Sequence, residues 1–269
     1  MKKDVCVGLI GGGQMGEALI RGMLASGLLE TGNIMVAEPD LERRAYMTEK
    51  YSIAGTDQAG ELCSFARVLI LAVKPQIVSS VLGQYKACVS GDHLLISIAA
   101  GISIGLMEDI LGKMRIIRVM PNTPALVLAG ASGLSPNDAA TEEDLDLAME
   151  IFSAIGTCVH VPETLLDAVT GLSGSGPGYV FTFIEAMIDG GVLAGLPRPV
   201  ATQLVLQTVY GSARLALETG KNPAELKGMV TSPGGTTIAG IHELEQGGLR
   251  GTVMAAVDRA SKRSRELGG

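Results

Sequence analysis

The amino-acid sequence predicts an α/β protein, in which a doubly wound parallel sheet is followed by an all-helical second domain. Two patterns in the chain lead to this prediction. Over residues 1–163, short apolar runs alternate with longer segments of helical spacing and charged outer faces, as in successive βαβ units. Beyond that point, segments of helical spacing follow one another and are separated by Gly, Pro and Asn signals.

The apolar runs of the first half have the length and composition of buried strands. Because helical segments separate most of them, right-handed crossovers and a parallel sheet are expected. The last helix of this half begins at Thr141, carries acidic residues in its first turn and ends at Gly156. The predicted strands are 5–10, 34–38, 68–73, 94–98, 115–120, 131–135 and 158–161.

The second half predicts helices throughout, and we expect a first domain over residues 1–163 and a helical domain over residues 164–269. The two central helices of this second domain carry few charges on any face, so other protein must cover them. A domain of about a hundred residues buries such helices poorly by itself. We therefore expect a homodimer joined through this half. The predicted helices are 165–174, 177–196, 197–220, 222–230, 236–248 and 249–267.

Composition excludes several classes of function. The chain has 269 residues, of which 47% are hydrophobic, and its net charge of −7 argues against sequence-independent binding of nucleic acid. The most apolar region, 178–218, is interrupted by charged residues and prolines, so no membrane span is expected. HELEQ at 242–246 lacks the second histidine of a zinc signature, and no metal site is predicted.

The expected location is the cytoplasm. The first apolar run leads directly into glycines, without the pattern of a secretory segment. The four cysteines show no C-x-x-C spacing and lie mainly in apolar contexts, which indicates buried thiols in a reducing compartment.

The segment GLIGGGQMGEAL contains a G-x-G-x-x-G motif at Gly11, Gly13 and Gly16. The motif follows a predicted strand and opens a predicted helix. This context provides a tight turn, room for a pyrophosphate against the backbone, and a helix N-terminus that faces the phosphates. Gln14 and Met15 complete the loop. We therefore predict a Rossmann domain that binds a dinucleotide.

The choice between NAD and NADP is open at this stage. Glu38 stands at the end of the next predicted strand, where an acidic residue usually accepts a hydrogen bond from the ribose 2′-hydroxyl and repels a 2′-phosphate. Arg43 and Arg44 follow, and arginines there could bind that phosphate. We favour the interpretation of both arginines as solvated helix charges.

Three further loops follow predicted strands: AVKPQ at 72–76, SIAAG at 97–101 and MPNTP at 120–124. In an open α/β sheet the ligand lies beyond the carboxyl ends of the strands, so these loops are expected to border the cofactor and substrate. Lys74 could act as a base, but a lysine before a proline is as readily a structural or phosphate-side charge. The candidate cofactor-binding residues are Ala72, Val73, Lys74, Pro75, Ala100, Gly101, Pro121 and Asn122.

Two glycine-rich segments lie in the helical half. TSPGGTT at 231–237 places a glycine pair among hydroxyl side chains, so outward-facing N–H groups and uncharged donors predict a site for a small anion. GLSGSGPGY at 171–179 leads into a helix through a proline, and its glycines permit close helix packing. Ser175 in this second segment is a candidate for the mouth of a binding pocket.

The motifs GLIGGGQMG, AVKP, SIAAG, MPNTPA, DAVTGLSGSGPGYVF, ELK and SPGGTT occur in this order across essentially the whole chain. Together they resemble pyrroline-5-carboxylate reductase. The resemblance implies reduction of 1-pyrroline-5-carboxylate to L-proline by NADPH or NADH, the final step of proline biosynthesis. It also implies a Rossmann domain for the cofactor and a helical domain that forms a homodimer, with a higher ring such as a decamer as an extension.

The resemblance further implies a role for the TSPGGTT segment. Its backbone amides and a serine hydroxyl would hold the substrate carboxylate, and Thr237 would hydrogen-bond the ring nitrogen, either donating a proton or only orienting the substrate. Because the imine arrives protonated or gains a proton from water, no strong acid is needed, and catalysis rests on positioning. The candidate substrate-binding residues are Ser175, Ser232, Gly234, Gly235, Thr236 and Thr237, of which Thr237 is also the catalytic candidate.

Two alternatives remain open at this stage. A β-hydroxyacid dehydrogenase shares the two-domain plan and uses a lysine from its helical half, for which Lys227 is the candidate. A non-catalytic nucleotide-binding module would bind the dinucleotide without turnover. The hydroxyl-rich segment 231–237 argues against the second alternative, since such a module needs no second anion site.

Overall fold

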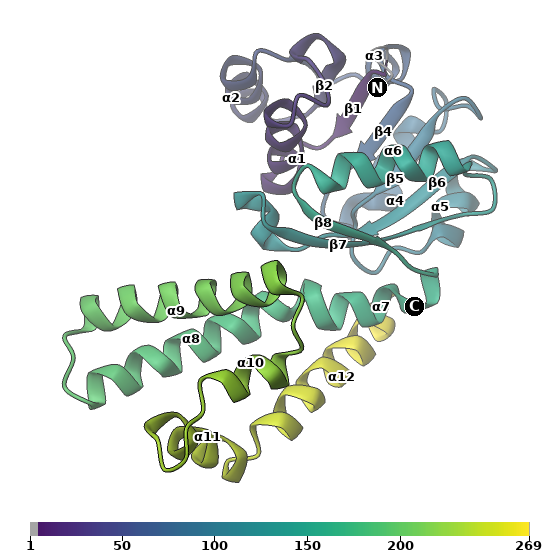
Figure 1. Ribbon diagram of the computed structural model, residues 1–269. Coiled ribbons are helices and arrows are strands. Elements are labelled where there is room, and N and C mark those ends of the chain that lie inside the picture. The colour runs from purple at the N-terminus through teal and green to yellow at the C-terminus, as the bar shows by residue number, and fades with distance from the viewer. Residues whose placement is uncertain (1–4, 269) are drawn as a thin grey trace. The chain divides into compact units, whose positions relative to one another are not determined.

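The computed structural model describes residues 5–268, and the chain divides into two compact units (Figure 1). The first unit comprises the residues up to Ser175 together with those from Asp258 onward, and the second comprises Gly176–Val257. This division falls beyond the boundary expected near residue 163, because the segment before Ser175 packs against the last strands of the sheet. The final helix also continues from the second unit into the first.

The first unit is built on one mostly parallel sheet, with eight strands among the described residues in the order β3-β2-β1-β4-β5-β6-β7-β8. Each neighbouring pair is parallel except β6 and β7, which are antiparallel. The predicted doubly wound sheet is confirmed. The strands are β1 (Val7–Ile10), β2 (Ile34–Ala37), β3 (Ala54–Thr56), β4 (Val68–Leu71), β5 (Leu94–Ser97), β6 (Arg115–Met120), β7 (Gly130–Pro136) and β8 (Gly156–His160).

Strand β3 was not predicted from the sequence. It is a short edge strand in which Ala54 and Gly55 are exposed, so it lacks the apolar run that signals a buried strand. Its place in the sheet comes from pairing with β2, in which Val36 lies opposite Gly55. A strand of this kind is determined by its neighbour rather than by its own side chains.

Helices cover both faces of the sheet, and successive strand residues alternate between two apolar cores. Val7 and Leu9 belong to one core, together with side chains of α1 and α6, whereas Ile10 belongs to the other, with side chains of α3, α4 and α5. The α-helices of this unit before its last segment are α1 (Gln14–Ala25), α2 (Leu41–Tyr51), α3 (Ala59–Phe65), α4 (Val78–Tyr85), α5 (Ile104–Leu111), α6 (Glu142–Ser153) and α7 (Leu166–Val169).

Short helical turns and caps complete the first unit. Helix α6 begins as predicted at Thr141, whose hydroxyl accepts from the Asp144 N–H, while the Asp144 carboxylate accepts from the Thr141 N–H. The 3₁₀ turns are η1 (Thr31–Asn33), η2 (Pro75–Ile77), η3 (Thr123–Val127) and η4 (Glu163–Leu165), and η5 (Thr170–Gly174) is a π-helical turn.

The second unit is all-helical, as predicted. Helices α8 and α9 pack on each other, yet α8 has no buried residue and α9 has only Ala201 and Val205 buried. Among the described residues, no helix is both long and apolar enough to cross a membrane. The helices are α8 (Gly176–Leu193), α9 (Arg198–Thr219), α10 (Pro223–Met229), α11 (Thr236–Gln246) and α12 (Leu249–Gly268).

Helices α1 and α2 are joined by a polar cluster centred on the Glu17 carboxylate. Lys50 pairs with this carboxylate at 2.9 Å, Arg43 also pairs with it, and the Tyr51 hydroxyl donates to it at 2.8 Å. Burial by itself would raise the pKa of Glu17, but hydrogen bonds from Lys50, Arg43 and Tyr51 outweigh it and lower that pKa from 4.5 to about 2. The folded state therefore favours the ionised carboxylate.

Replacing Glu17 by Gln is expected to lower the free energy of unfolding at pH 7 by about 1–3 kcal/mol, because Arg43, Lys50 and Tyr51 lose their charged acceptor. Since the folded-state pKa of Glu17 is depressed, its contribution is complete above pH 4.5 and declines as the pH falls toward about 2. The difference in free energy of unfolding between the wild type and Glu17→Gln should therefore shrink as the pH falls. Urea unfolding of both proteins between pH 7 and pH 3 measures this difference. The exposed Glu49 on α2 supplies the control Glu49→Gln, and a difference independent of pH would contradict the assignment.

Candidate active site

The predicted glycine motif forms the turn between β1 and α1. Gly11 has a φ of +102°, in the left-handed region, and its N–H donates to the Ala37 carbonyl at 2.8 Å. A side chain at Gly11 would meet the Ala72 carbonyl oxygen and the Val73 side chain, each at 2.9 Å. The turn is therefore fitted against the two strands that flank β1.

Of the other two motif glycines, Gly16 is required by close packing within the protein, whereas Gly13 faces open space. A Cβ at Gly16 would lie 2.6 Å from the Gly11 carbonyl oxygen, so the close packing of the turn against α1 requires glycine there. A Cβ at Gly13 would meet no atom within 4 Å, and Gly13 and Gln14 are exposed at the start of the helix, with Met15 half-buried behind them. The open side of the turn at Gly13 therefore leaves room for a phosphate group at the helix N-terminus.

The sheet brings the other predicted cofactor residues to the edge where the glycine turn lies. Ile10, at the end of β1, pairs with Leu71 of β4, which pairs with Ser97 of β5. The loops after these parallel strands therefore emerge side by side. Lys74 and Ala100 are exposed there, Pro121 is buried, and the rest are half-buried, namely Ala72, Val73, Pro75, Gly101 and Asn122.

Asn122 has protein partners for both ends of its side-chain amide. Its Nδ2 donates to the Ser173 carbonyl at 3.0 Å, and its Oδ1 accepts from the Ala131 N–H at 2.8 Å. Asn122 thus fixes the loop after β6 to η5 and β7. Its candidate role in cofactor binding stays a prediction, and these contacts assign the side chain a positioning role.

Gly101 has a φ of +74°, and a Cβ there would lie 3.6 Å from the Leu267 carbonyl oxygen near the end of α12. Nearby, the Ser264 hydroxyl donates to the Asp167 carboxylate at 2.6 Å. Both contacts lie within the first unit. The last turn of α12 thus contacts a candidate cofactor loop, and no local pattern in the sequence predicts this contact, because the two segments lie far apart along the chain.

Glu38 lies directly against the glycine turn. One of its carboxylate oxygens accepts from the Gly12 N–H at 2.8 Å, and the other accepts from the Asp40 N–H at 3.1 Å. Its backbone N–H is bound to the Thr56 carbonyl at 3.0 Å. The carboxylate is thereby held at the end of β2, where a dinucleotide-binding sheet receives the adenosine ribose.

The two arginines after Glu38 are bound within the protein. The Arg43 Nε donates to the Gly12 carbonyl at 2.6 Å while its guanidinium pairs with Glu17, and Arg44 pairs with Asp57 at 3.2 Å. The interpretation of these residues as solvated helix charges is therefore wrong. Arg43 links the glycine turn to the Glu17 cluster, and Arg44 anchors the segment after β2 through the Glu38 carbonyl.

The predicted anion loop lies in the second unit and forms a tight turn before α11. Pro233 is followed by Gly234 with a φ of +69°, and the Gly235 N–H donates to the Ser232 carbonyl at 3.0 Å. Proline and then a positive-φ glycine are the central residues of a type II turn. A Cβ at Gly235 would lie 2.3 Å from the Ser232 hydroxyl oxygen, so a side chain at this position would require that hydroxyl to move.

The turn delivers the chain into an uncapped helix N-terminus. Gly235 is the N-cap of α11 and offers no side chain, so the first N–H groups of the helix have no cap from it. Thr236 and Thr237 are the first two helical residues and are exposed, as is Ser232. Backbone donors, hydroxyls and the positive end of a helix dipole thus meet at one point of the surface.

A hollow of about 420 Å³ lies beside this turn and runs along α11. Gly234 and Gly235 line one end, and Ile238, Ile241 and His242 line its length. His242 lies outside the motifs that predict binding, so the sequence assigns it no functional place. It shares the hollow because it follows Gly235 by two helical turns and therefore lies on the same face of α11.

The remaining candidates have simpler settings. Ser175 is half-buried in the first unit, directly after η5, and its N–H donates to the Thr170 carbonyl at 2.8 Å. Lys227, the residue of the hydroxyacid dehydrogenase alternative, is exposed on α10, and its carbonyl accepts from the Thr231 hydroxyl. Lys227 therefore helps to fix the start of the anion loop through its backbone.

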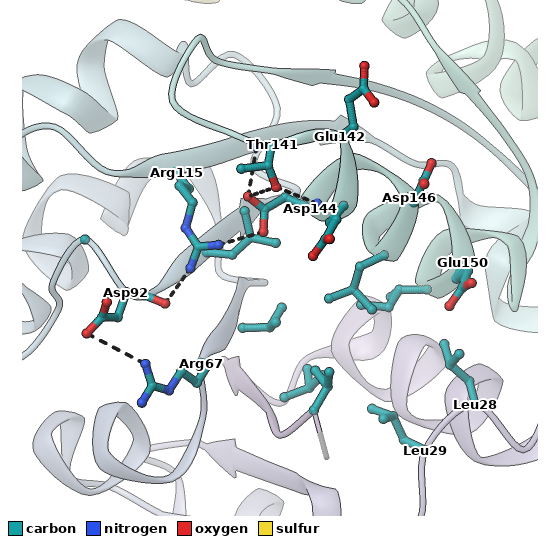
Figure 2. Close-up of a pocket in the computed structure, with 18 residues that line it drawn as sticks. Leu28, Leu29, Arg67, Asp92, Arg115, Thr141, Glu142, Asp144, Asp146 and Glu150 are labelled. Atoms are coloured by element: carbon teal, nitrogen blue, oxygen red, sulfur yellow. Dashed lines mark hydrogen bonds and ion pairs between the residues drawn. The ribbon is translucent and has the colours of Figure 1, made fainter. Parts of the chain in front are cut away.

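A hollow of about 1260 Å³ in the first unit lies at the amino ends of the parallel strands, whereas the glycine turn lies at their carboxyl ends. It is lined by the first residues of β1, β4, β5 and β6, at the amino ends of these strands. Figure 2 shows Arg115 between Asp92 and Asp144, with an Arg115–Asp144 distance of 2.8 Å, and Arg67 near Asp92 at 3.7 Å. Because its arginines are already paired and parallel sheets bind ligands at the carboxyl edge, this hollow is not the dinucleotide site.

A glycine turn at the carboxyl edge of a Rossmann sheet, followed by a helical unit with a donor-rich turn at a helix N-terminus, is typical of dinucleotide-dependent oxidoreductases. Family models agree with this class. Residues 163–267 match the family described as pyrroline-5-carboxylate reductase dimerisation, and residues 6–101 match the family described as NADP oxidoreductase, coenzyme F420-dependent. The chain belongs to the pyrroline-5-carboxylate reductase family.

Relatives at high identity cover nearly the whole chain. A pyrroline-5-carboxylate reductase of Methanosarcina acetivorans is 51% identical over 266 residues, which cover 97% of each protein, and one of Escherichia coli is 42% identical over 262 residues, again covering 97% of each. A solved structure from Coxiella burnetii has a TM-score of 0.95 at 37% identity and covers 98% of this chain and 99% of that one. A Plasmodium falciparum structure with NADP bound has a TM-score of 0.87 at 34% identity and covers 99% of each chain.

The glycine turn yields a paired prediction. Gly13→Ala is expected to change the free energy of unfolding by less than about 1 kcal/mol, since its Cβ meets no protein atom. It should nevertheless weaken dinucleotide binding by about tenfold or more, because the Cβ occupies space that the pyrophosphate needs. Gly16→Ala should instead destabilise the fold by about 1–3 kcal/mol through its clash with the Gly11 carbonyl.

Urea unfolding and titration with NADH, followed by fluorescence, measure the two effects separately. Unchanged affinity in Gly13→Ala would place the pyrophosphate elsewhere than at this helix N-terminus.

Proposed function

We propose that this chain reduces 1-pyrroline-5-carboxylate to L-proline with NADPH or NADH, the final step of proline biosynthesis. The observation that carries the proposal is the turn at 232–235, which presents an uncapped helix N-terminus flanked by hydroxyl side chains. Such a site suits a carboxylate on a small molecule. Family membership supports the same reaction, and the glycine turn with its open side at Gly13 fits the cofactor.

The substrate carboxylate would be held at the start of α11. The N–H groups of Thr236 and Thr237 belong to the first turn of the helix, where they have no intrahelical acceptor. Together with the Ser232 hydroxyl and the helix dipole they supply donors without a cationic side chain, which favours one carboxylate group over bulkier polyanions. Gly234 and Gly235 keep the approach to these donors clear of side chains. Ser175, in the first unit, stays a prediction from the sequence.

The reaction requires hydride on the imine carbon and a proton on the imine nitrogen. A bound reduced nicotinamide supplies the hydride. The Thr237 hydroxyl would lie beside the ring nitrogen, and a hydroxyl both donates and accepts, so it can stabilise either protonation state of the imine. Because a basic imine draws its proton from water, the protein's main contribution is to hold the substrate in a reactive orientation.

We further propose that the chain uses NADH effectively. The Glu38 carboxylate, held by the Gly12 N–H, stands where a ribose 2′-hydroxyl would donate to it and where a 2′-phosphate would be repelled. Arg43 and Arg44 are already paired with Glu17 and Asp57, so neither compensates that repulsion without breaking an ion pair. A relative in the same family was solved with NADP bound, so this selectivity would be a property of this chain's own loop.

The proposed working assembly is a cytoplasmic homodimer joined through α8 and α9. Both helices leave large apolar side chains exposed, among them Phe181 and Phe183 on α8 and Leu204 and Tyr210 on α9. Apolar surface of this extent on a soluble chain indicates a protein interface. The match of this region to a dimerisation family supports that occupant. Such dimers would in turn form a ring, such as a decamer.

Replacing Thr237 by Ala is expected to lower kcat/KM for 1-pyrroline-5-carboxylate by about 10- to 100-fold, the loss of one hydrogen bond to a charged group. Thr237→Ser keeps the hydroxyl and should retain most of the activity. The assay follows oxidation of NADH or NADPH with racemic substrate, and binding of the cofactor alone should be unchanged in both variants.

Cofactor binding without oxidation by wild-type protein would overturn the proposed reaction. Oxidation of a β-hydroxyacid that depends on Lys227 would then favour the dehydrogenase alternative, and the absence of turnover with either substrate would favour the nucleotide-binding module.

Replacing Glu38 by Ser is expected to shift the ratio of kcat/KM values from NADH toward NADPH by about tenfold or more, because the charge that repels the 2′-phosphate is removed. Glu42 is exposed on the following helix, so Glu42→Ser removes an equal charge without touching the glycine turn. Steady-state kinetics with both cofactors measure the ratio. An equal shift in the two variants would reduce the effect to net charge, and an unchanged ratio would exclude Glu38 as the determinant.

A further inference from the structure

Two thiols that the proposed reaction does not use lie against each other in the first unit. Cys63 is on α3 and Cys88 lies just beyond the end of α4, and their sulfur atoms are 2.6 Å apart. A disulfide bond is about 2.05 Å long, so closing the pair requires the sulfurs to approach by only roughly half an ångström. Only Cys63 is buried, which corrects the expectation of buried thiols for the other three cysteines.

The surrounding structure holds both cysteines in place. Helices α3 and α4 pack on each other, and the Cys88 thiol donates to the Tyr85 carbonyl at 3.2 Å. The buried His93 accepts from the Ser90 N–H at its Nδ1, so its Nε2 carries the proton and donates to the Cys63 carbonyl at 3.1 Å. These contacts fix the backbone at Cys63 and the turn after α4, and they thereby hold the two sulfur atoms close together.

The two thiols differ in access to solvent. Cys63 is 8% exposed within an apolar cluster. Burial raises the pKa of its thiol well above the ordinary value, and the neighbouring Cys88 raises it further. Cys88 is only half-buried at the rim of the same cluster. An oxidant arriving from solvent therefore meets Cys88 first, and Cys63 is positioned behind it to complete the reaction.

We propose that Cys63 and Cys88 form an oxidisable thiol pair that small-molecule disulfides such as oxidised glutathione convert to an intramolecular disulfide. The Cys88 thiolate attacks one sulfur of oxidised glutathione, forms a mixed disulfide and releases one glutathione. The Cys63 thiol then loses its proton and attacks the Cys88 sulfur, which releases the second glutathione. Both protein thiols are oxidised, and one glutathione disulfide is reduced to two thiols.

The disulfide would stabilise the fold without blocking the candidate active site. Cys63 precedes β4 and Cys88 precedes β5, so both lie toward the amino edge of the sheet, whereas the glycine turn and its neighbouring loops lie at the carboxyl edge. The bond would close the chain segment that contains β4 and α4 into a loop, which restricts the unfolded state. The expected consequence is higher thermal stability with unchanged turnover.

The test incubates the full-length protein with mixtures of oxidised and reduced glutathione and then alkylates the remaining thiols. Peptide mass spectrometry should show loss of alkylation at Cys63 and Cys88 together, with one peptide linking them, while Cys6 and Cys158 stay alkylated. A mixed disulfide that persists at Cys88, or equal alkylation of all four cysteines, would overturn the proposal. This measurement uses wild-type protein, so it stands even where a variant folds poorly.

Thermal unfolding gives the second readout. Oxidised wild-type protein should melt several degrees above the reduced form, and Cys63→Ser and Cys88→Ser should each abolish this shift, whereas Cys158→Ser should keep it. Addition of dithiothreitol should reverse the shift in the wild type. A shift that survives in Cys88→Ser would show that another oxidation causes it.

Discussion

The pairing of β1 between β2 and β4 is the constraint on which the rest of the first unit depends. Val7 pairs with Ile34 on one side and with Val68 on the other, and the parallel register runs without a break to the ends of all three strands. Three loops are thereby forced to leave the sheet at the same edge. The glycine turn needs this arrangement, because Gly11 can approach Ala72 closely only when β4 ends beside β1.

Charge then fixes the turn that this pairing has placed. Glu38 binds the Gly12 N–H, Arg43 binds the Gly12 carbonyl, and Glu17 holds Arg43 from the helix behind. The cluster that stabilises the packing of α1 on α2 thus also shapes the glycine turn at the candidate cofactor site. A charge change in this region therefore acts on stability and on cofactor selectivity together, which is why a control on α2 outside the cluster is informative.

The second unit depends on a different balance, between exposed apolar surface and backbone donors. Helices α8 and α9 expose apolar side chains that a second copy would bury, while the N-cap residue of α11, Gly235, has no side chain to bond the first backbone donors of that helix. The exposed apolar side chains cost free energy in an isolated chain until a partner covers them, whereas water hydrogen-bonds the exposed backbone donors of α11 until a ligand replaces it. Association of two copies would bury the apolar surface of α8 and α9, and ligand binding would occupy the backbone donors at the start of α11.

The sequence by itself determined the features that depend on local pattern and spacing. The buried strands, the glycine turn, the cap at Thr141, the glycine pair before α11 and the apolar helices all carry their signal within a few residues, because burial period and turn chemistry are local properties. Only the tertiary structure decided the short strand β3, the bonding of Asn122, the ion pairs of Arg43 and Arg44, and the contact of Cys63 with Cys88. These features join segments that are distant in the chain, and such contacts arise only when strand order brings the segments together.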